Sequence, residues 1–333
     1  MNQKGNFIES VHLLRGVAAL MVVVYHLIGW FPLGVIDTIH ASAGDYGRMG
    51  VAVFFVISGF VLPLSLGSES RLAKFPRFML RRFIRIEPTF IVSLIVSSII
   101  FAVKTRLAPN GIPWVPELGQ IASHFLYLIP FTEWDWVNVV YWTLAIEFQY
   151  YLVIGLSFPL IQRFVAAQPR FGPIITIAAM AFLVYLAPLV PPLEFFAFAP
   201  YFALGLTAYF LYKGQLPLAP AILLSFGCLF LGLGHGLTLS HLLVSVGSVF
   251  LIALWKAPRL PLRWLGTISY SLYIIHYPIV EFVSQAAAAK LPGSPILYAI
   301  PFLNIALSLA AAWLLYRLVE KPTQAFSRKL RSR

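Results

Sequence analysis

Long apolar runs separated by short polar segments make up almost the whole chain. Ten of these runs meet or nearly meet the ~20 residues that a helix needs to cross a bilayer. They lack the alternation of apolar and polar residues that marks membrane-spanning strands, so the pattern predicts an all-α polytopic membrane protein. The predicted spans cover residues 11–31, 48–66, 86–104, 140–160, 172–190, 196–212, 218–236, 239–255, 264–284 and 295–317.

The amino-acid composition supports the same fold class. Hydrophobic residues make up 60% of the 333 residues and charged residues only 11%, whereas soluble domains carry about 25% charged residues. We therefore expect lipid to surround most of the chain. No stretch is polar enough for a separate soluble domain, so residues 1–333 are predicted to form a single transmembrane domain.

The basic residues fix the predicted orientation. Of the 24 lysines and arginines, 20 fall on the side of the predicted topology that holds both termini. The positive-inside rule makes that side cytoplasmic. Anionic lipid headgroups then account for the net charge of +12 without a nucleic-acid partner. Between the spans we expect a basic cytoplasmic loop over residues 67–85 and a long outer loop over residues 105–139.

A single cysteine, Cys228, excludes an intrachain disulfide and a zinc site built from cysteine clusters. We expect no metal in this protein.

The first span, residues 11–31, carries two ionisable residues in apolar surroundings, Arg15 and His26. Eleven residues of α-helix make three turns plus ~20°, so both side chains lie on one face, ~16 Å apart along the axis. Ionisable residues inside a membrane are functional by default. The alternative is that each side chain snorkels to the nearer membrane surface.

The segment RLAKFPRFMLRRFIRIEP, residues 71–88, is the most basic part of the chain. Arg81 and Arg85 are four residues apart and share a helical face, with Arg82 beside them. Guanidinium groups suit phosphate, which favours a socket for a phosphorylated cytoplasmic ligand. A cytoplasmic flank that contacts anionic lipid explains the charge as well. Glu87 follows this run and dilutes it little.

Glu147 is the carboxylate that the predicted topology places deep in a span. It lies ~10 Å below the outer end of its span, and His26 lies ~8 Å below the outer end of the first span. A carboxylate at the same depth as an imidazole can orient it as a base. Alternatively, the two residues are unrelated and each is satisfied by neighbouring groups.

The roles of several further polar residues are open. His276 lies in the outer half of the ninth span within LGTISYSLYIIHYPIV, residues 265–280. The serines of this segment are typical of helix packing. Asp37 and Asp45, in the first outer loop, could shape an entrance, although a solvated loop explains them equally well.

Taken together, these motifs resemble the membrane acyltransferase-3 family, the bacterial transmembrane O-acyltransferases. LRGVAALMVVVYH matches the Arg-x10-His element of that family, and the order of the remaining elements also agrees. These elements are GVAVFFVISGFV, RRFIRIEP, YWTLAIEFQYYL, LGTISYSLYIIHYPI and VEKP. The resemblance covers essentially the whole chain, and the absence of an esterase-like segment after the last span makes us expect a stand-alone form.

The resemblance implies transfer of an acyl group from cytoplasmic acyl-CoA to a hydroxyl of an extracytoplasmic acceptor such as a saccharide. We expect the acyl group to be acetyl. The resemblance also implies His26, Glu147 and Arg15 as catalytic residues, with His26 as the base. Arg81, Arg82 and Arg85 become the candidate contacts of the CoA phosphates. Thr143, where serine is usual, and Glu87, where an aromatic residue is common, depart from the family pattern.

A proton-coupled transporter or flippase of a lipid-linked or polar substrate is the alternative function, because the same ionisable residues could line a path through the membrane. The absence of an internal inverted repeat disfavours it. In either case the protein is expected in the bacterial cytoplasmic (inner) membrane, in contact with lipid. The sequence leaves the acceptor and the oligomeric state open.

Overall fold

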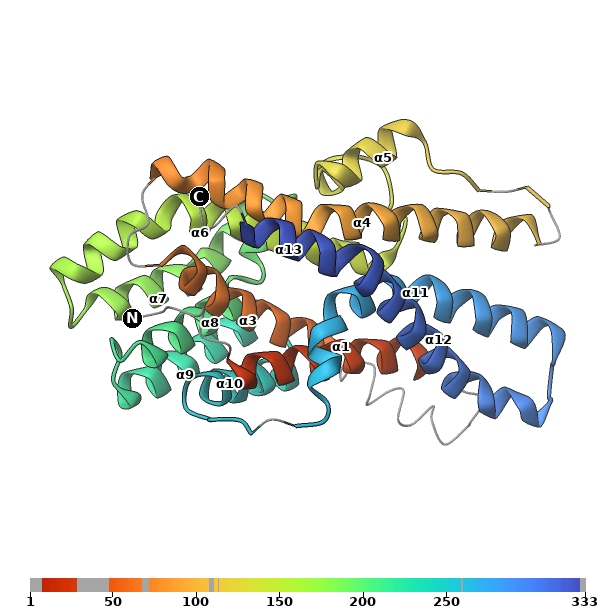
Figure 1. Cartoon of the computed structure of the whole chain (residues 1–333). Coiled ribbons are helices and arrows are strands. Elements are labelled where there is room, and N and C mark those ends of the chain that lie inside the picture. Colours follow the sequence, from red (N-terminus) through yellow and green to blue (C-terminus); the bar gives the residue numbers. More distant parts are fainter. Residues whose placement is uncertain are drawn as a thin grey trace. The chain divides into compact units, whose positions relative to one another are not determined.

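A computed structural model describes residues 8–28, 48–67, 72–107, 111–112, 114–258 and 260–329. Within these ranges all regular structure is helical and no strand occurs, as Figure 1 shows. The all-α prediction is therefore confirmed. Asp37 and Asp45 lie outside the described residues.

A helix lies in each of the ten ranges predicted to cross the membrane. Within the described residues two further short helices, α5 (Leu118–Phe125) and α13 (Lys321–Lys329), lie outside those ranges. The ten helices are α1 (Glu9–Ile28), α3 (Arg48–Leu66), α4 (Phe75–Arg106), α6 (Trp142–Ala167), α7 (Gly172–Phe182), α8 (Ala199–Tyr212), α9 (Leu218–Gly234), α10 (Leu239–Ala253), α11 (Arg263–Lys290) and α12 (Ile300–Leu315).

Six helical segments of the described chain are long and apolar enough to cross a membrane by themselves. The helices α9 and α10 are apolar but shorter. A multi-pass membrane protein is thus supported, whereas ten crossings and cytoplasmic termini stay predictions. The six segments are Glu9–Ile28, Met49–Leu66, Leu72–Arg106, Val139–Ala167, Gly172–Leu189 and Pro295–Lys329.

The basic segment becomes helical before the predicted span begins. The predicted cytoplasmic loop over residues 67–85 is helical from Phe75 onward, where α4 begins, and its place on the cytoplasmic side stays a prediction. From there on the segment consists largely of arginine, leucine, methionine and other residues that a helix accepts. Pro76 falls in the first turn, where its missing N–H breaks no helical hydrogen bond. The arginines therefore lie on the first turns of a 32-residue helix. We predict that these turns extend from the membrane into the cytoplasm.

The last predicted span also departs from a plain α-helix at both ends. A 3₁₀ segment, Pro295–Ala299, precedes α12, and a π-helical turn, Tyr316–Glu320, joins α12 to α13. Such turns insert one extra residue and change the direction of the following side chains. In this chain the turn carries the buried carboxylate of Glu320, which accepts a hydrogen bond of 2.6 Å from the Ser271 hydroxyl on α11.

The helices group into two compact units. The first comprises Met1–Ala18, Arg48–Lys74 and Gln149–Thr267. The second comprises Ala19–Gly47, Phe75–Phe148 and Ile268–Arg333. Each unit is therefore assembled from segments that are distant in the sequence.

In the first unit α8 forms the centre. Twelve of its 14 residues are buried, as expected for a helix that is apolar on all sides. It packs closely against α3, since a Cβ atom added at Gly205 would lie 2.4 Å from the Val56 carbonyl oxygen and 2.5 Å from the Gly59 Cα atom. Glycine at both positions allows the two backbones to meet, as in other membrane helix pairs.

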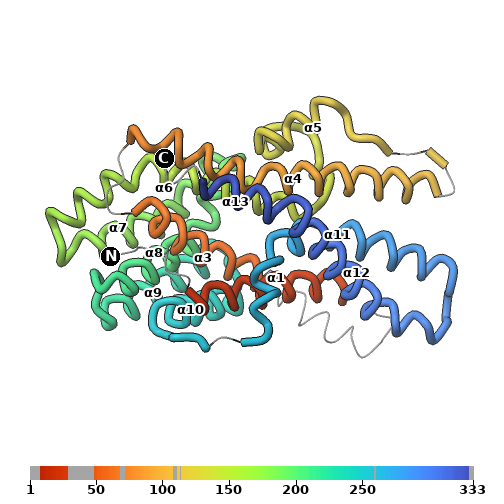
Figure 2. The backbone as a smooth tube through the Cα atoms, viewed as in Figure 1, coloured from red at the N-terminus to blue at the C-terminus, as the bar shows by residue number. Residues whose placement is uncertain are grey.

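In the second unit hydrogen bonds tie α11 to α4. The Tyr270 hydroxyl donates to the Ile86 carbonyl (3.3 Å), and the Ser93 hydroxyl donates to the Ile274 carbonyl (2.9 Å). Figure 2 shows α11 and α12 as a hairpin, and Asn304 of α12 donates to Ser284 of α11 (2.9 Å). The chain then returns to the start of α4 through α13.

We predict that Gly205→Ala destabilises the protein by about 1–3 kcal/mol, because the methyl group overpacks the contact between α3 and α8. The measurement is the loss of folded protein on heating in detergent. Gly227→Ala in α9 is the matched control, since no atom lies within 4 Å of the added Cβ atom. Equal stability of the two variants would contradict the close contact.

Candidate active site

Two imidazole rings meet in the second unit. His276 Nε2 lies 3.0 Å from His26 Nδ1, and the ring centroids are 5.1 Å apart. His276 is fully buried, whereas His26 is half-buried. The rings of Tyr25 and Tyr277 approach His26 edge-to-face at 4.9 and 5.0 Å. These contacts hold the His26 ring in one orientation.

The carbonyl groups nearby determine which nitrogen carries the proton. His276 Nδ1 lies 3.1 Å from the Leu272 carbonyl oxygen and must be protonated to make that bond. In the neutral ring its Nε2 is then an acceptor. His26 Nδ1 lies 3.0 Å from the Val22 carbonyl oxygen and is likewise protonated. It donates to both Val22 and His276, so Nε2 of neutral His26 carries the lone pair that a general base needs.

Glu147 lies on α6, one turn beyond Thr143. The Thr143 hydroxyl is 2.8 Å from the hydroxyl of Tyr273 on α11. The Tyr273 ring is 6.2 Å from the His276 ring. The structure thus connects the surroundings of Glu147 with the imidazole pair through Tyr273. A direct role of Glu147 in orienting His26 stays a prediction.

The three arginines proposed as phosphate contacts stand in the first part of α4 and are all half-buried. The Arg82 guanidinium lies 5.6 Å from the centroid of the Phe78 ring. The Ser327 hydroxyl of α13 donates to the Arg81 carbonyl (2.9 Å), which fastens α13 to this part of α4. The basic cluster and the imidazole pair therefore belong to the same compact unit.

Arg15 stands in the part of α1 that belongs to the first unit, where α1 contacts the start of α11. Its neighbour one turn earlier, His12, binds the Arg263 carbonyl (2.9 Å) and the Thr267 hydroxyl (3.1 Å) through Nε2. A Cβ atom at Gly266 would lie 2.1 Å from the His12 carbonyl oxygen. The two helices are thus in close backbone contact next to Arg15.

The family model described as "Acyltransferase domain" matches residues 8–317. The chain belongs to this acyltransferase family. The resemblance noted in the sequence motifs is therefore confirmed.

Two curated relatives illustrate the range of similarity within the acyltransferase family. The chain is 31% identical over 156 residues to the acyltransferase MdmB of Streptomyces mycarofaciens, which covers 45% of this chain and 39% of the relative. It is 25% identical over 381 aligned positions to the peptidoglycan O-acetyltransferase OatA of Listeria monocytogenes, which covers 95% and 56%. The chain spans about half the length of these relatives or less. No solved structure matches it.

Glu87, which departs from the acyltransferase family pattern, is buried inside α4 and only 2% exposed. The Tyr127 hydroxyl donates a hydrogen bond to its Oε1 atom. The Tyr127 ring stacks on Phe90 and Phe148, at centroid distances of 5.8 and 4.7 Å. Within the described residues the second carboxyl oxygen of Glu87 has no hydrogen-bond partner. Glu87 lies at the predicted inner end of its span, whereas Tyr127 belongs to the predicted outer loop. The segment around Tyr127 therefore reaches further along α4 than the predicted topology implies.

Hydrogen bonds of His124 connect α5 with the segment around it. His124 Nδ1 donates to the Gln120 carbonyl (2.8 Å) and His124 Nε2 accepts from the Val137 N–H (3.1 Å). Burial lowers the pKa of His124 below its ordinary value, so the ring stays neutral and can serve as donor and acceptor at once. Tyr127 itself adopts a left-handed backbone conformation, with φ of 54°. This unusual conformation places its ring among the helices of the unit.

Sequence reasoning missed two features of this region. It named Glu147 as the carboxylate deep in a span, but Glu147 is half-buried, while Glu87 and Glu320 are each only 2% exposed. It also left the role of His276 open, although this residue is the hydrogen-bond partner of His26. The signal for the second feature was present, because both histidines fall in the outer halves of their predicted spans.

We predict that Tyr127→Phe lowers the free energy of unfolding by about 1–3 kcal/mol, because it removes the donor to a buried carboxyl group. Thermal unfolding in detergent measures the change. Tyr298→Phe is the matched control, since the Tyr298 side chain is exposed.

A double variant makes this prediction specific to the hydrogen bond. Replacement of both partners by apolar groups, Glu87→Leu with Tyr127→Phe, leaves no buried carboxyl group without a donor. We expect it to be more stable than the sum of the two single changes implies. Strict additivity would show that the contact contributes nothing.

Proposed function

We propose that this protein transfers an acetyl group from cytoplasmic acetyl-CoA to a hydroxyl group of an extracytoplasmic saccharide. Membership of the acyltransferase family supports the reaction class, and the name of the relative OatA supports an O-acetyl product on a glycan. The hydrogen bond between His26 and His276 carries the proposal, because it leaves Nε2 of His26 as a base.

The proposal includes the predicted topology of ten crossings with both termini in the cytoplasm of a bacterial cell, and a location in the cytoplasmic membrane. In this topology the start of α4 faces the cytoplasm and His26 lies in the outer half of the membrane. The donor therefore enters from the basic end of α4 and the acceptor from the opposite side.

Acetyl-CoA suits the layout of the second unit. Arg81, Arg82 and Arg85 offer guanidinium groups for its phosphates. Twelve residues of helix, ~18 Å, separate Arg81 from Ser93, which bonds to the carbonyl of Ile274, two residues before His276. An extended pantetheine arm can follow this length of helix and bring the thioester toward the imidazole pair. Arg15 has the role of steering the incoming donor.

The chemistry is general-base catalysis of ester formation. His26 Nε2 takes the proton of the acceptor hydroxyl while its oxygen attacks the thioester carbonyl carbon. The carbon–sulfur bond then breaks, and the departing CoA thiolate takes the proton back from the imidazolium of His26. The products are an O-acetyl ester and free CoA, and no metal takes part.

His276 and Glu147 act on His26 in this scheme. The imidazolium that forms during the reaction keeps its Nδ1 proton directed at Val22 and at the lone pair of His276. The negative charge of Glu147 favours the same protonated state. His276 is therefore a positioning residue, whose removal should alter the pH profile of the reaction as well as its rate.

We predict that His26→Ala lowers the turnover of the full chain in proteoliposomes by ~10²–10⁴-fold, the usual contribution of a general base. The assay follows radiolabel from acetyl-CoA into chitotetraose, where mild alkali should release it because it is held as an ester. His235→Ala is the matched control, because His235 lies outside the second unit.

Transfer by His26→Ala at the rate of the unmodified protein would remove His26 from the mechanism. Movement of the saccharide across the membrane without acetylation would instead favour the transporter alternative. Mass spectrometry of surface glycans from cells with and without the protein identifies the natural acceptor.

We also predict that Arg85→Gln raises the KM for acetyl-CoA by about tenfold or more, because a hydrogen bond to a charged group contributes ~1.5–3 kcal/mol. The KM for S-acetyl-pantetheine, which lacks the nucleotide phosphates, should not change. Arg170→Gln serves as the control for loss of one basic charge. An equal rise of KM for both donors would argue against phosphate binding by Arg85.

A further inference from the structure

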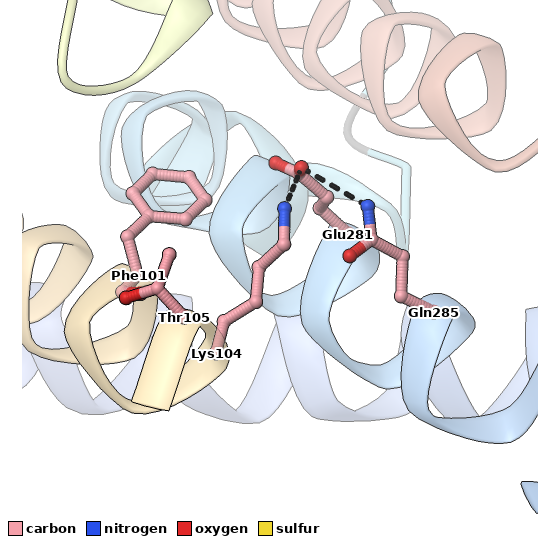
Figure 3. A network of polar contacts seen from close by, with 5 residues as sticks. All are labelled: Phe101, Lys104, Thr105, Glu281 and Gln285. Carbon is pink, nitrogen blue, oxygen red and sulfur yellow. Dashed lines mark hydrogen bonds and ion pairs between the residues drawn. The ribbon is translucent and has the colours of Figure 1, made fainter. Parts of the chain in front are cut away.

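An ion pair joins α4 to α11 beyond the imidazole pair. The Lys104 ammonium donates to Oε1 of Glu281, and the Gln285 amide lies 3.3 Å from the same oxygen, as Figure 3 shows. The side chains of Lys104 and Glu281 are 27% and 16% exposed. Both side chains are therefore partly exposed at the surface of the protein.

Aromatic rings connect this polar cluster with His26. The Lys104 ammonium lies 5.6 Å from the centroid of the Phe101 ring. Tyr277, whose ring contacts His26, precedes Glu281 by one turn of α11, and the Glu281 carboxylate acts electrostatically on its hydroxyl. Five residues of helix, about 7.5 Å, separate His276 from Glu281 along the axis.

Stability alone explains this ion pair poorly. Charged groups in membrane helices are expensive, and they often mark a substrate path. A partly exposed ion pair contributes only ~0–1 kcal/mol, so this pair is weak evidence for a purely stabilising role. In Figure 3 both bonds go to one carboxylate oxygen, and the other oxygen points away from Lys104 and Gln285.

The chemistry of the cluster suits the hydroxyl groups of a sugar. A carboxylate accepts hydrogen bonds, whereas an ammonium and an amide donate them, and sugar hydroxyls do both. Aromatic rings with polar neighbours offer surface to the apolar faces of a sugar ring.

We infer that Lys104, Glu281 and Gln285 form the subsite that holds the acceptor saccharide beside His26. The inference rests on the proposed function, since it assigns the acceptor side of that reaction. In the predicted topology these residues lie toward the outer ends of their helices, where an extracytoplasmic saccharide arrives.

The test compares Glu281→Gln with the unmodified full chain in two assays. One measures the KM values for chitotetraose and for acetyl-CoA, and the other measures chitotetraose binding by saturation-transfer NMR without turnover. We expect the KM for chitotetraose to rise about tenfold or more, as for loss of a hydrogen bond to a charged group. The KM for acetyl-CoA should stay unchanged.

Two further variants separate ligand binding from a structural clamp. The charge exchange Lys104→Glu with Glu281→Lys keeps an ion pair between the helices, so it should recover thermal stability while chitotetraose binding remains lost. Ser284→Ala removes the nearby bond to Asn304 and should lower stability without changing either KM.

Unchanged chitotetraose binding in Glu281→Gln overturns the inference, as does recovery of binding by the charge exchange or an unmodified protein that binds no saccharide. Failure of the proposed function is distinguishable. In that case the unmodified protein transfers no acetyl group, while its saccharide binding still depends on Glu281.

Discussion

Polar groups in the second unit must find partners inside the protein, because lipid offers none. Many of these groups bond to carbonyl oxygens, and the Ile274 carbonyl accepts from both Ser93 and Asn138. Among the described residues Oε2 of Glu87 and Oδ1 of Asn304 are exceptions without a hydrogen-bond partner. The Ser93 hydroxyl also lies 2.7 Å from the Tyr141 hydroxyl. The position of α11 relative to α4 follows from these bonds, and with it the place of His276. The candidate site is therefore a product of the same requirement that holds the helices together.

The sequence predicts the fold class and the location of the helices well, because apolar length is a direct consequence of bilayer thickness. It predicts local departures poorly. Nothing in the pattern of residues 316–320 distinguishes a π-helical turn from α-helix, and the charges of residues 75–85 end the apolar run without ending the helix. These boundaries depend on neighbouring elements such as α13, which a reading of one segment does not include.

The candidate site could also be predicted only in part from the sequence. Arg15, His26 and Glu147 could be selected from the sequence because ionisable residues are rare in apolar runs. Their partners could not, since hydrogen bonds such as that between His26 and His276 join residues 250 positions apart. The pairing of Glu87 with Tyr127 was equally hidden, because it requires a left-handed residue in the outer segment to enter the unit. The sequence predicts only the depth of a residue in the membrane. That depth limits which residues could be hydrogen-bond partners but does not identify them.

The contact between Glu87 and Tyr127 also has an evolutionary meaning. An acid at position 87 is tolerable only while a phenol at position 127 reaches it, and that phenol in turn occupies a backbone conformation which most side chains avoid. A substitution at either position alone gives a less stable protein. Substitutions at the two positions should therefore occur together in evolution, although the positions are 40 residues apart in the sequence.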